Sequence, residues 1–309
     1  MTKPRAGPPV PTNDRWPPEE IARLAATSGK PLEVTCAVAF LRSQWEAWLG
    51  PHFDDGGQPR ELDVLAEKTT VDETPTHKLG IMSTTRLLVS CKGFPKERSP
   101  LVYSASPASM TALGPSLVAS QIAVPGWWPD SRPHLSDIEA RAARHLLGTL
   151  GLRDNRQAVG FDVIERSEYP QKSNLPPRIE YKRATDGDRT IYSAMNSALK
   201  ATLFWNQHIP NSSTHDTQPT IILHVPVCIL SVPMWDVSID GGRVAEPKMQ
   251  SFAFQTTFYP AGGEERQPTT ILADQAKLDV LITALDSLHN WLRQEIRARL
   301  SASARTEKR

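Results

Sequence analysis

The chain has 309 residues, of which 39% are apolar and 22% charged, the proportions of a soluble globular protein with one large domain or two ordinary ones. Lys and Arg number 35 against 34 Asp and Glu, so the overall charge excludes a protein that coats nucleic acid, although a local basic surface stays open. No stretch approaches the ~20 apolar residues of a membrane span. The Pro-rich, polar N-terminus has no apolar core of a signal peptide. We therefore expect a cytoplasmic protein without a membrane partner, in which residues 1–17 are disordered.

The three cysteines are far apart, and each lies in an apolar run: Cys36, Cys91 and Cys228. No CxxC pair or Cys/His pair of a zinc site occurs. The pattern predicts buried, reduced thiols, which are typical of a cytosolic protein.

The first hundred residues predict two helices followed by two strands. Residues 18–27 open with a proline and two glutamates, which favour a helix start, and Ser28-Gly29-Lys30 ends that helix. A second helix is expected over residues 31–49, because large apolar residues recur there at spacings of three and four on one face: Val38, Leu41, Trp45 and Trp48. The strands are expected at residues 60–67 and 86–92.

The middle of the chain is less regular. Residues 105–135 are rich in Ser, Pro and Gly and hold Trp127-Trp128, a pair that either packs its own loop or stacks on a nucleic-acid base. Beyond them the patterns predict a helix at 136–150, strands at 101–104, 160–164 and 178–183, and a helix at 189–208 with the stripe Met195, Leu199 and Leu203.

The last third predicts strands and then a long helix. Residues 220–230 form an apolar run typical of a strand buried on both faces, in which His224 is expected to be a core residue. Strands at 235–239 and 251–259 precede a helix over 272–300, whose apolar face is Leu278, Leu281, Leu285, Leu288, Leu292 and Ile296. A basic tail, 301–309, follows. This order of elements predicts an α/β fold with a central mixed sheet flanked by helices.

Two short strands carry the residues of chemical interest. Alternate residues of a strand point to the same face, so Glu61 shares a face with Asp63, and Ser90 shares one with Lys92. If the strands pair in a suitable register, two carboxylates, a hydroxyl and an ammonium converge. Carboxylates hold Mg²⁺ or Mn²⁺, and a neighbouring lysine stabilises charge that develops at a phosphodiester.

The chain resembles the restriction-endonuclease-like PD-(D/E)XK nuclease superfamily in the runs Gly29-Lys-Pro-Leu-Glu33, Trp48, Arg60-Glu-Leu-Asp-Val-Leu-Ala66 and Leu88-Val-Ser-Cys-Lys92. The resemblance implies that Glu33 is the helix glutamate, Asp63 the metal-binding aspartate and Lys92 the catalytic lysine. Cys91 would contact the metal through its carbonyl. It also implies one nuclease-like domain over 18–300 with an insertion at 105–160, a Mg²⁺-dependent (or Mn²⁺-dependent) site that cuts DNA, or alternatively RNA, and a role in bacterial defence.

Ser90 departs from the superfamily pattern, which has an acidic residue at that position. Either another carboxylate replaces it, with Glu33, Glu61 and Glu97 as candidates, or the site has decayed. In the second case the domain would bind nucleic acid, a partner protein or a second copy of itself without cutting.

A rival triplet stands later in the chain. Glu180-Tyr181-Lys182 is an intact ExK, and Asp162 precedes it in a short apolar run. The alternative to a catalytic role for this triplet is a surface hairpin with ordinary charges. An unrelated α/β enzyme that uses Glu61, Asp63 and Lys92 differently also stays open, and Glu33 has an alternative role as an anion at a helix N-terminus.

Overall fold

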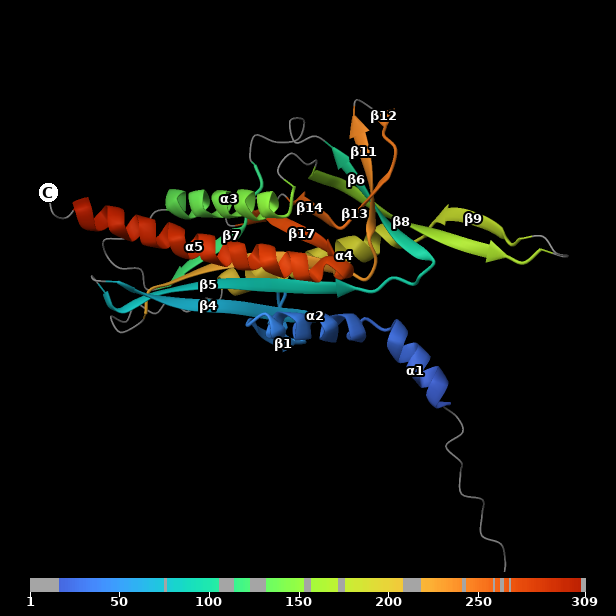
Figure 1. The fold of residues 1–309 in the computed structure, drawn as a ribbon, viewed down its shortest axis with the longest axis horizontal. Helices are drawn as coiled ribbons and strands as arrows, with labels where there is room; N and C mark the ends of the chain where they lie inside the picture. The colour runs from blue at the N-terminus through green and yellow to red at the C-terminus, as the bar shows by residue number, and fades with distance from the viewer. Residues whose placement is uncertain are drawn as a thin grey trace, which may run out of the picture.

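The computed structural model describes residues 17–74, 77–105, 114–122, 132–152, 157–171, 176–207, 218–240, 243–257, 259–261, 264–266 and 268–306. Over these residues the chain is a mixed α/β protein, with a mixed central sheet and five α-helices (Figure 1). The predicted fold class is confirmed at this level. The expectations for residues 1–16, Trp127-Trp128 and 307–309 lie outside the described residues.

A seven-stranded sheet forms the centre, in the order β1-β4-β5-β10-β17-β14, with β7 also paired to β10. β10 runs parallel to β5 and β17, whereas the other pairs are antiparallel. The strand bounds are β1 Glu46–Leu49, β4 Val64–Thr74, β5 His77–Lys92, β7 Val118–Ile122, β10 Thr220–Leu230, β14 Phe252–Thr256 and β17 Thr269–Asp274.

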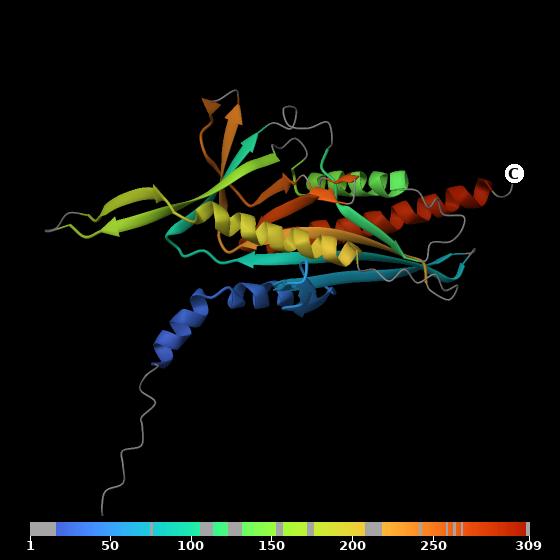
Figure 2. The same cartoon turned by 180° about the vertical axis from the view of Figure 1, so that it is seen from behind.

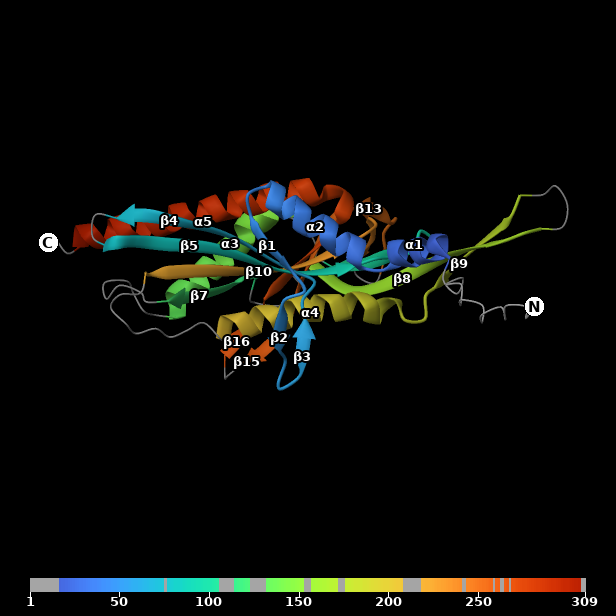
Figure 3. The same ribbon diagram turned by 90° about the horizontal axis from the view of Figure 1, so that it is seen from below.

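Helices cover both faces of this sheet (Figure 3). α2 (Lys30–Arg42), α3 (Arg132–Thr149) and α5 (Leu278–Thr306) share one apolar core with one face, and α4 (Gly187–Gln207) packs on the other. α1 (Pro18–Thr27) precedes α2. Every residue of β10 is buried, as predicted for a strand covered on both sides. The predicted apolar faces of the last helix and of the helix at 189–208 are also buried.

A second, six-stranded sheet stands beside the first, in the order β12-β11-β6-β8-β9, with β13 paired to β11. Its hairpin of β8 and β9 projects from the body, as seen from behind in Figure 2. The bounds are β6 Arg98–Ala105, β8 Gln157–Tyr169, β9 Arg178–Arg183, β11 Met234–Asp240, β12 Arg243–Val244 and β13 Lys248–Gln250. Two small hairpins complete the strands: β2 (His52–Asp54) with β3 (Pro59–Glu61), and β15 (Tyr259–Ala261) with β16 (Glu264–Arg266).

The helix predicted over 31–49 is wrong in its second half, because α2 ends at Arg42 and β1 follows. Gln44 has a φ of +62°, the left-handed conformation that closes helices, and Trp45 N–H donates to the Phe40 carbonyl at 3.1 Å. The Trp45 and Phe40 rings then pack with centroids 6.1 Å apart. Of the four residues on the predicted apolar face, three are exposed: Val38 and Leu41 face outward from α2, and Trp48 lies on β1.

Two other boundaries differ from the expectation. The strand expected at 60–67 is interrupted at Leu62 and Asp63, since β3 pairs with β2 while β4 pairs with β5. The last helix begins at Leu278 rather than 272, because β17 occupies the preceding residues and the Asp274 carboxylate accepts a hydrogen bond from Ala276 N–H at 3.0 Å. The segment 105–160 supplies β7 to the central sheet and α3 to its core. Of the described helices, none has the length and apolar character needed to cross a membrane.

Candidate functional site

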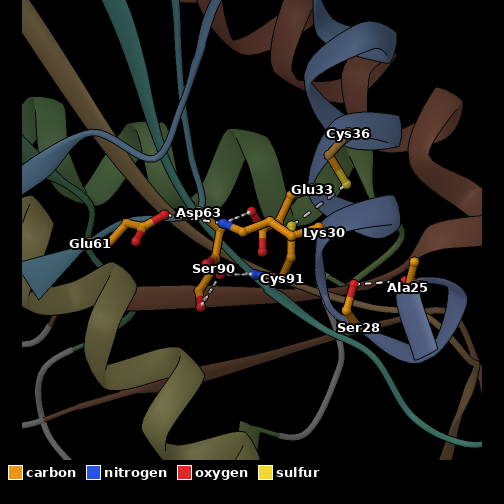
Figure 4. Close-up of polar contacts among 9 residues, drawn as sticks. All are labelled: Ala25, Ser28, Lys30, Glu33, Cys36, Glu61, Asp63, Ser90 and Cys91. Carbon is orange, nitrogen blue, oxygen red and sulfur yellow. Dashed lines mark hydrogen bonds and ion pairs between the residues drawn. The ribbon is translucent and has the colours of Figure 1, made fainter. Parts of the chain in front are cut away.

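The site lies where β4 begins and β5 ends. Val64 of β4 pairs with Val89 of β5. Asp63, immediately before β4, therefore lies opposite Ser90 of β5. The Ser90 hydroxyl donates to Asp63 Oδ2 at 3.0 Å, and the Cys91 backbone N–H donates to the same oxygen at 2.6 Å (Figure 4). These two donors, both on β5, which lies between β4 and β10, fix the Asp63 carboxylate in one orientation.

Lys92 belongs to the same face as Asp63 and Ser90, because residues two apart on a strand point the same way. The charge effects on a neighbouring thiol agree with this. Cys228, on β10, pairs with Ser90 of β5. The pKa of the Cys228 thiol is raised to about 12, chiefly by burial. This pKa includes smaller effects of the Asp63 charge, which raises it, and of the Lys92 ammonium, which lowers it. The structure therefore brings together three of the residues that the sequence singled out.

The Lys92 side chain is half-buried and makes no hydrogen bond or ion pair with any other residue that the structure describes. Cys91 points to the opposite face, where its thiol lies 3.8 Å from that of Cys36 on α2. This contact and burial raise the pKa of the Cys91 thiol well above its usual range. All three cysteines are free and buried, which confirms the prediction.

α2 brings a second carboxylate and a cation that the sequence analysis did not single out. Glu33, in the first turn of α2, is 6% exposed. The Lys30 ammonium lies 2.8 Å from Glu33 Oε2 and 3.1 Å from Glu61 Oε1, and so bridges the helix to the end of β3 (Figure 4). The hydrogen bond to Glu33, and then that to Glu61, raises the pKa of Lys30 above its usual range. The spacing Lys30 to Glu33 at a helix start was the available signal.

The rival triplet does not converge in the same way. Asp162 makes an ion pair of 2.6 Å with Arg183 Nε. Glu180 pairs with Ser167, five positions beyond Asp162 on β8, and every residue of β9 is exposed. This arrangement matches the alternative of a surface hairpin with ordinary charges. Glu97, the third candidate for a replacement carboxylate, is exposed in the loop before β6.

The candidate ligands at the site are oxygen donors, the chemical type that a hard cation prefers. The carboxylates of Glu33, Glu61 and Asp63 supply oxygen ligands, which Mg²⁺ prefers. Within the described part of the chain, however, no three His, Cys, Asp or Glu side chains already stand in a metal-binding arrangement. The ammonium of Lys30 balances two of these three carboxylates, Glu33 and Glu61.

Gly50 leaves room for the Glu61 carboxylate and provides a test of this geometry. Its φ is +62°, and a Cβ at this position would lie 2.9 Å from Glu61 Oε1. We expect Gly50→Ala to lower the free energy of unfolding by more than the ~1–2 kcal/mol of left-handed strain, because it also pushes the carboxylate away from Lys30. Urea unfolding would measure it.

Gly56→Ala is the matched control for Gly50→Ala, since Gly56 has a φ of +63° with nothing within 4 Å of the added Cβ. It carries the backbone strain without the contact. Equal losses of stability in the two variants would contradict a contribution of the contact between Glu61 and Lys30 to the free energy of unfolding.

The chain matches no protein-family model, no curated protein and no solved structure. The residues of the site offer one carboxylate fixed by neutral donors, an ammonium without a partner among the described residues, and a carboxylate pair bridged by a lysine.

Proposed function

We propose that the chain is a Mg²⁺-dependent phosphodiesterase that cleaves DNA and belongs to the restriction-endonuclease-like PD-(D/E)XK type. One observation carries the proposal: Asp63, Ser90 and Lys92 share one face at the adjoining ends of β4 and β5. An acidic group and a lysine in this relation suit metal-assisted hydrolysis of a phosphodiester. The helix glutamate, Glu33, reaches the same end of the sheet through Lys30 and Glu61.

Each side chain has a distinct role in this proposal. Asp63 would bind the cation, and Glu61 or Glu33 would replace the acidic ligand that Ser90 does not supply. Bound Mg²⁺ would polarise the phosphate and lower the pKa of a water molecule. Lys92, whose ammonium is not neutralised by any described carboxylate, would orient the attacking water and stabilise the charge that develops on the phosphate. Ser90 is a positioning residue, because its hydroxyl holds the Asp63 carboxylate.

The first experiment compares wild type with Asp63→Asn on plasmid, linear duplex, single-stranded DNA and RNA, with Mg²⁺, Mn²⁺ or EDTA. We expect metal-dependent cleavage by wild type. The variant should lose at least about 100-fold, because the amide still accepts the hydrogen bonds of Ser90 and Cys91 but binds metal poorly, and a bound metal contributes several kcal/mol to the transition state. Glu180→Gln, the same exchange in the exposed β9, should cleave like wild type.

Two results would overturn this function. Wild type that is inert on every substrate with both metals removes the catalytic proposal. Loss of cleavage in Glu180→Gln, with Asp63→Asn intact, would move the site to the rival triplet.

A second function is favoured by one observation, the neutralisation of Glu33 and Glu61 by Lys30. Together with Ser90 in place of an acid, it suits a non-catalytic member of the same type, which binds nucleic acid, a partner protein or a second copy. An inert wild type that still retards duplex DNA in a gel would support this alternative. Sizing by light scattering would detect self-association.

A further inference from the structure

Lys30 occupies an unfavourable position for a cation within its own helix. It is the first residue of α2, where the unpaired backbone N–H groups and the helix dipole already concentrate positive charge. The ammonium is stabilised instead by two carboxylates, Glu33 on the same helix and Glu61, 31 positions away. The two carboxylates, one from α2 and one from the end of β3, thus offset the unfavourable position of this cation at the start of the helix.

The two sides of this ion pair differ in burial. Glu33 is 6% exposed, and a carboxylate that is so far removed from water needs a positive partner. The Lys30 side chain is 65% exposed, so it can leave for water at little cost. A buried acid with an exposed, flexible base forms a pair in which the cation is exchangeable.

We infer that Lys30 is a built-in counter-cation that competes with a divalent metal for the oxygens of Glu33 and Glu61. The inference rests on the proposed function, because it concerns the affinity of the same site. An ammonium and a divalent cation cannot both occupy the oxygens that Lys30 now holds. Lys30 therefore weakens metal binding and keeps the carboxylates paired when metal is scarce.

The test is metal binding without substrate. The probe is Mn²⁺ alone, titrated into the full chain and followed by the electron paramagnetic resonance signal of the free ion. Lys30→Met removes the charge but keeps most of the length, and Lys30→Arg keeps the charge. We expect Lys30→Met to bind Mn²⁺ roughly fivefold more tightly than wild type, the size of one partly exposed ion pair. Lys30→Arg should stay within about twofold of wild type.

Further arms separate this inference from the function on which it rests. Lys30→Gln repeats the loss of charge, and circular dichroism checks that each variant is folded. If wild type and both neutral variants bind Mn²⁺ equally, Lys30 is not a competitor, and the metal site itself stands. Weaker binding by the neutral variants would make Lys30 an organiser of the ligands and overturn the inference. If no folded variant binds Mn²⁺, the proposed metal site falls together with it.

Discussion

Lowering the pH from 6.5 to 4 is expected to reduce the free energy of unfolding by roughly 3 kcal/mol for each of two buried histidines. Burial lowers the pKa of His224 to about 3, and the positive charge of Arg86 contributes. Burial, with the charges of Lys68 and Arg293, lowers the pKa of His289 to about 4.

The surroundings of the two rings explain these shifts. His224 is fully buried in β10, with Nε2 at 3.0 Å from the Ser120 hydroxyl. His289 lies between two threonine hydroxyls, at 2.9 Å from Thr70 Oγ1 and 3.1 Å from Thr85 Oγ1. Neither ring is hydrogen-bonded to a carboxylate among the described residues, so little compensates the cost of charging it. The expectation that His224 is a core residue is confirmed, and its Nδ1 is buried without a hydrogen-bond partner among the described residues.

The sign follows from proton uptake. In the unfolded chain both histidines take up protons as the pH falls through 6.5, whereas the folded protein keeps them neutral until the pH nears 4 and 3. The unfolded state therefore binds more protons, and stability is lost on acidification across this window. Urea unfolding at pH 7 and pH 4 measures the loss.

His289→Gln isolates the contribution of one ring to this pH dependence. It should shrink the difference between pH 7 and pH 4 by about 3 kcal/mol relative to wild type. His52→Gln is the control, since His52 is exposed. An unchanged pH dependence in His289→Gln would show that this ring has the same pKa in the folded and unfolded protein.

Lys92→Met is expected to reduce the rate of metal-dependent cleavage by about 100- to 1000-fold, the effect of removing one group that stabilises charge in a transition state. The variant keeps the apolar length of a half-buried side chain, so the fold should hold. Mn²⁺ binding should stay within about twofold of wild type, because the Lys92 ammonium, unlike that of Lys30, holds no carboxylate oxygen of a described residue. Single-turnover cleavage assays and Mn²⁺ titration give the two readouts.

Lys96→Met is the matched control for Lys92→Met, because Lys96 is exposed in the loop after β5. It should cleave like wild type. Cleavage by Lys92→Met at the wild-type rate would remove this residue from the chemistry and leave Asp63 without its proposed partner.

Much of the fold followed from local patterns. The apolar run of β10 and the heptad-like face of α5 predict burial by composition and spacing alone, and both are buried. The stretch 31–49 failed because Val38 and Leu41 have helical spacing and yet face outward. What ends α2 is the packing of Trp45 on Phe40 together with a hydrogen bond from Trp45 Nε1 to Asp286, 241 positions away.

The residues of the candidate site likewise fall into those that the sequence predicts and one that it does not. Alternation along a strand places Ser90 and Lys92 on one face, and a single register brings Asp63 to them. The role of Lys30 could not be predicted from the sequence, because one of its partners, Glu61, is remote in sequence. Glu61 is positioned by a separate hairpin, β2 with β3. No local pattern predicts which hairpin a side chain will meet.

The pairing of β5 with β10 also governs how the protein folds. Met82 pairs with Thr220, 138 positions later, and the ladder continues to Lys92 and Leu230. Contacts between segments so distant in sequence are slow to form, because a long loop must close before any of its hydrogen bonds is gained. β5 thus acquires β10 late, whereas the contact between Ser90 and Asp63 joins residues only 27 positions apart and can form before that long loop has closed.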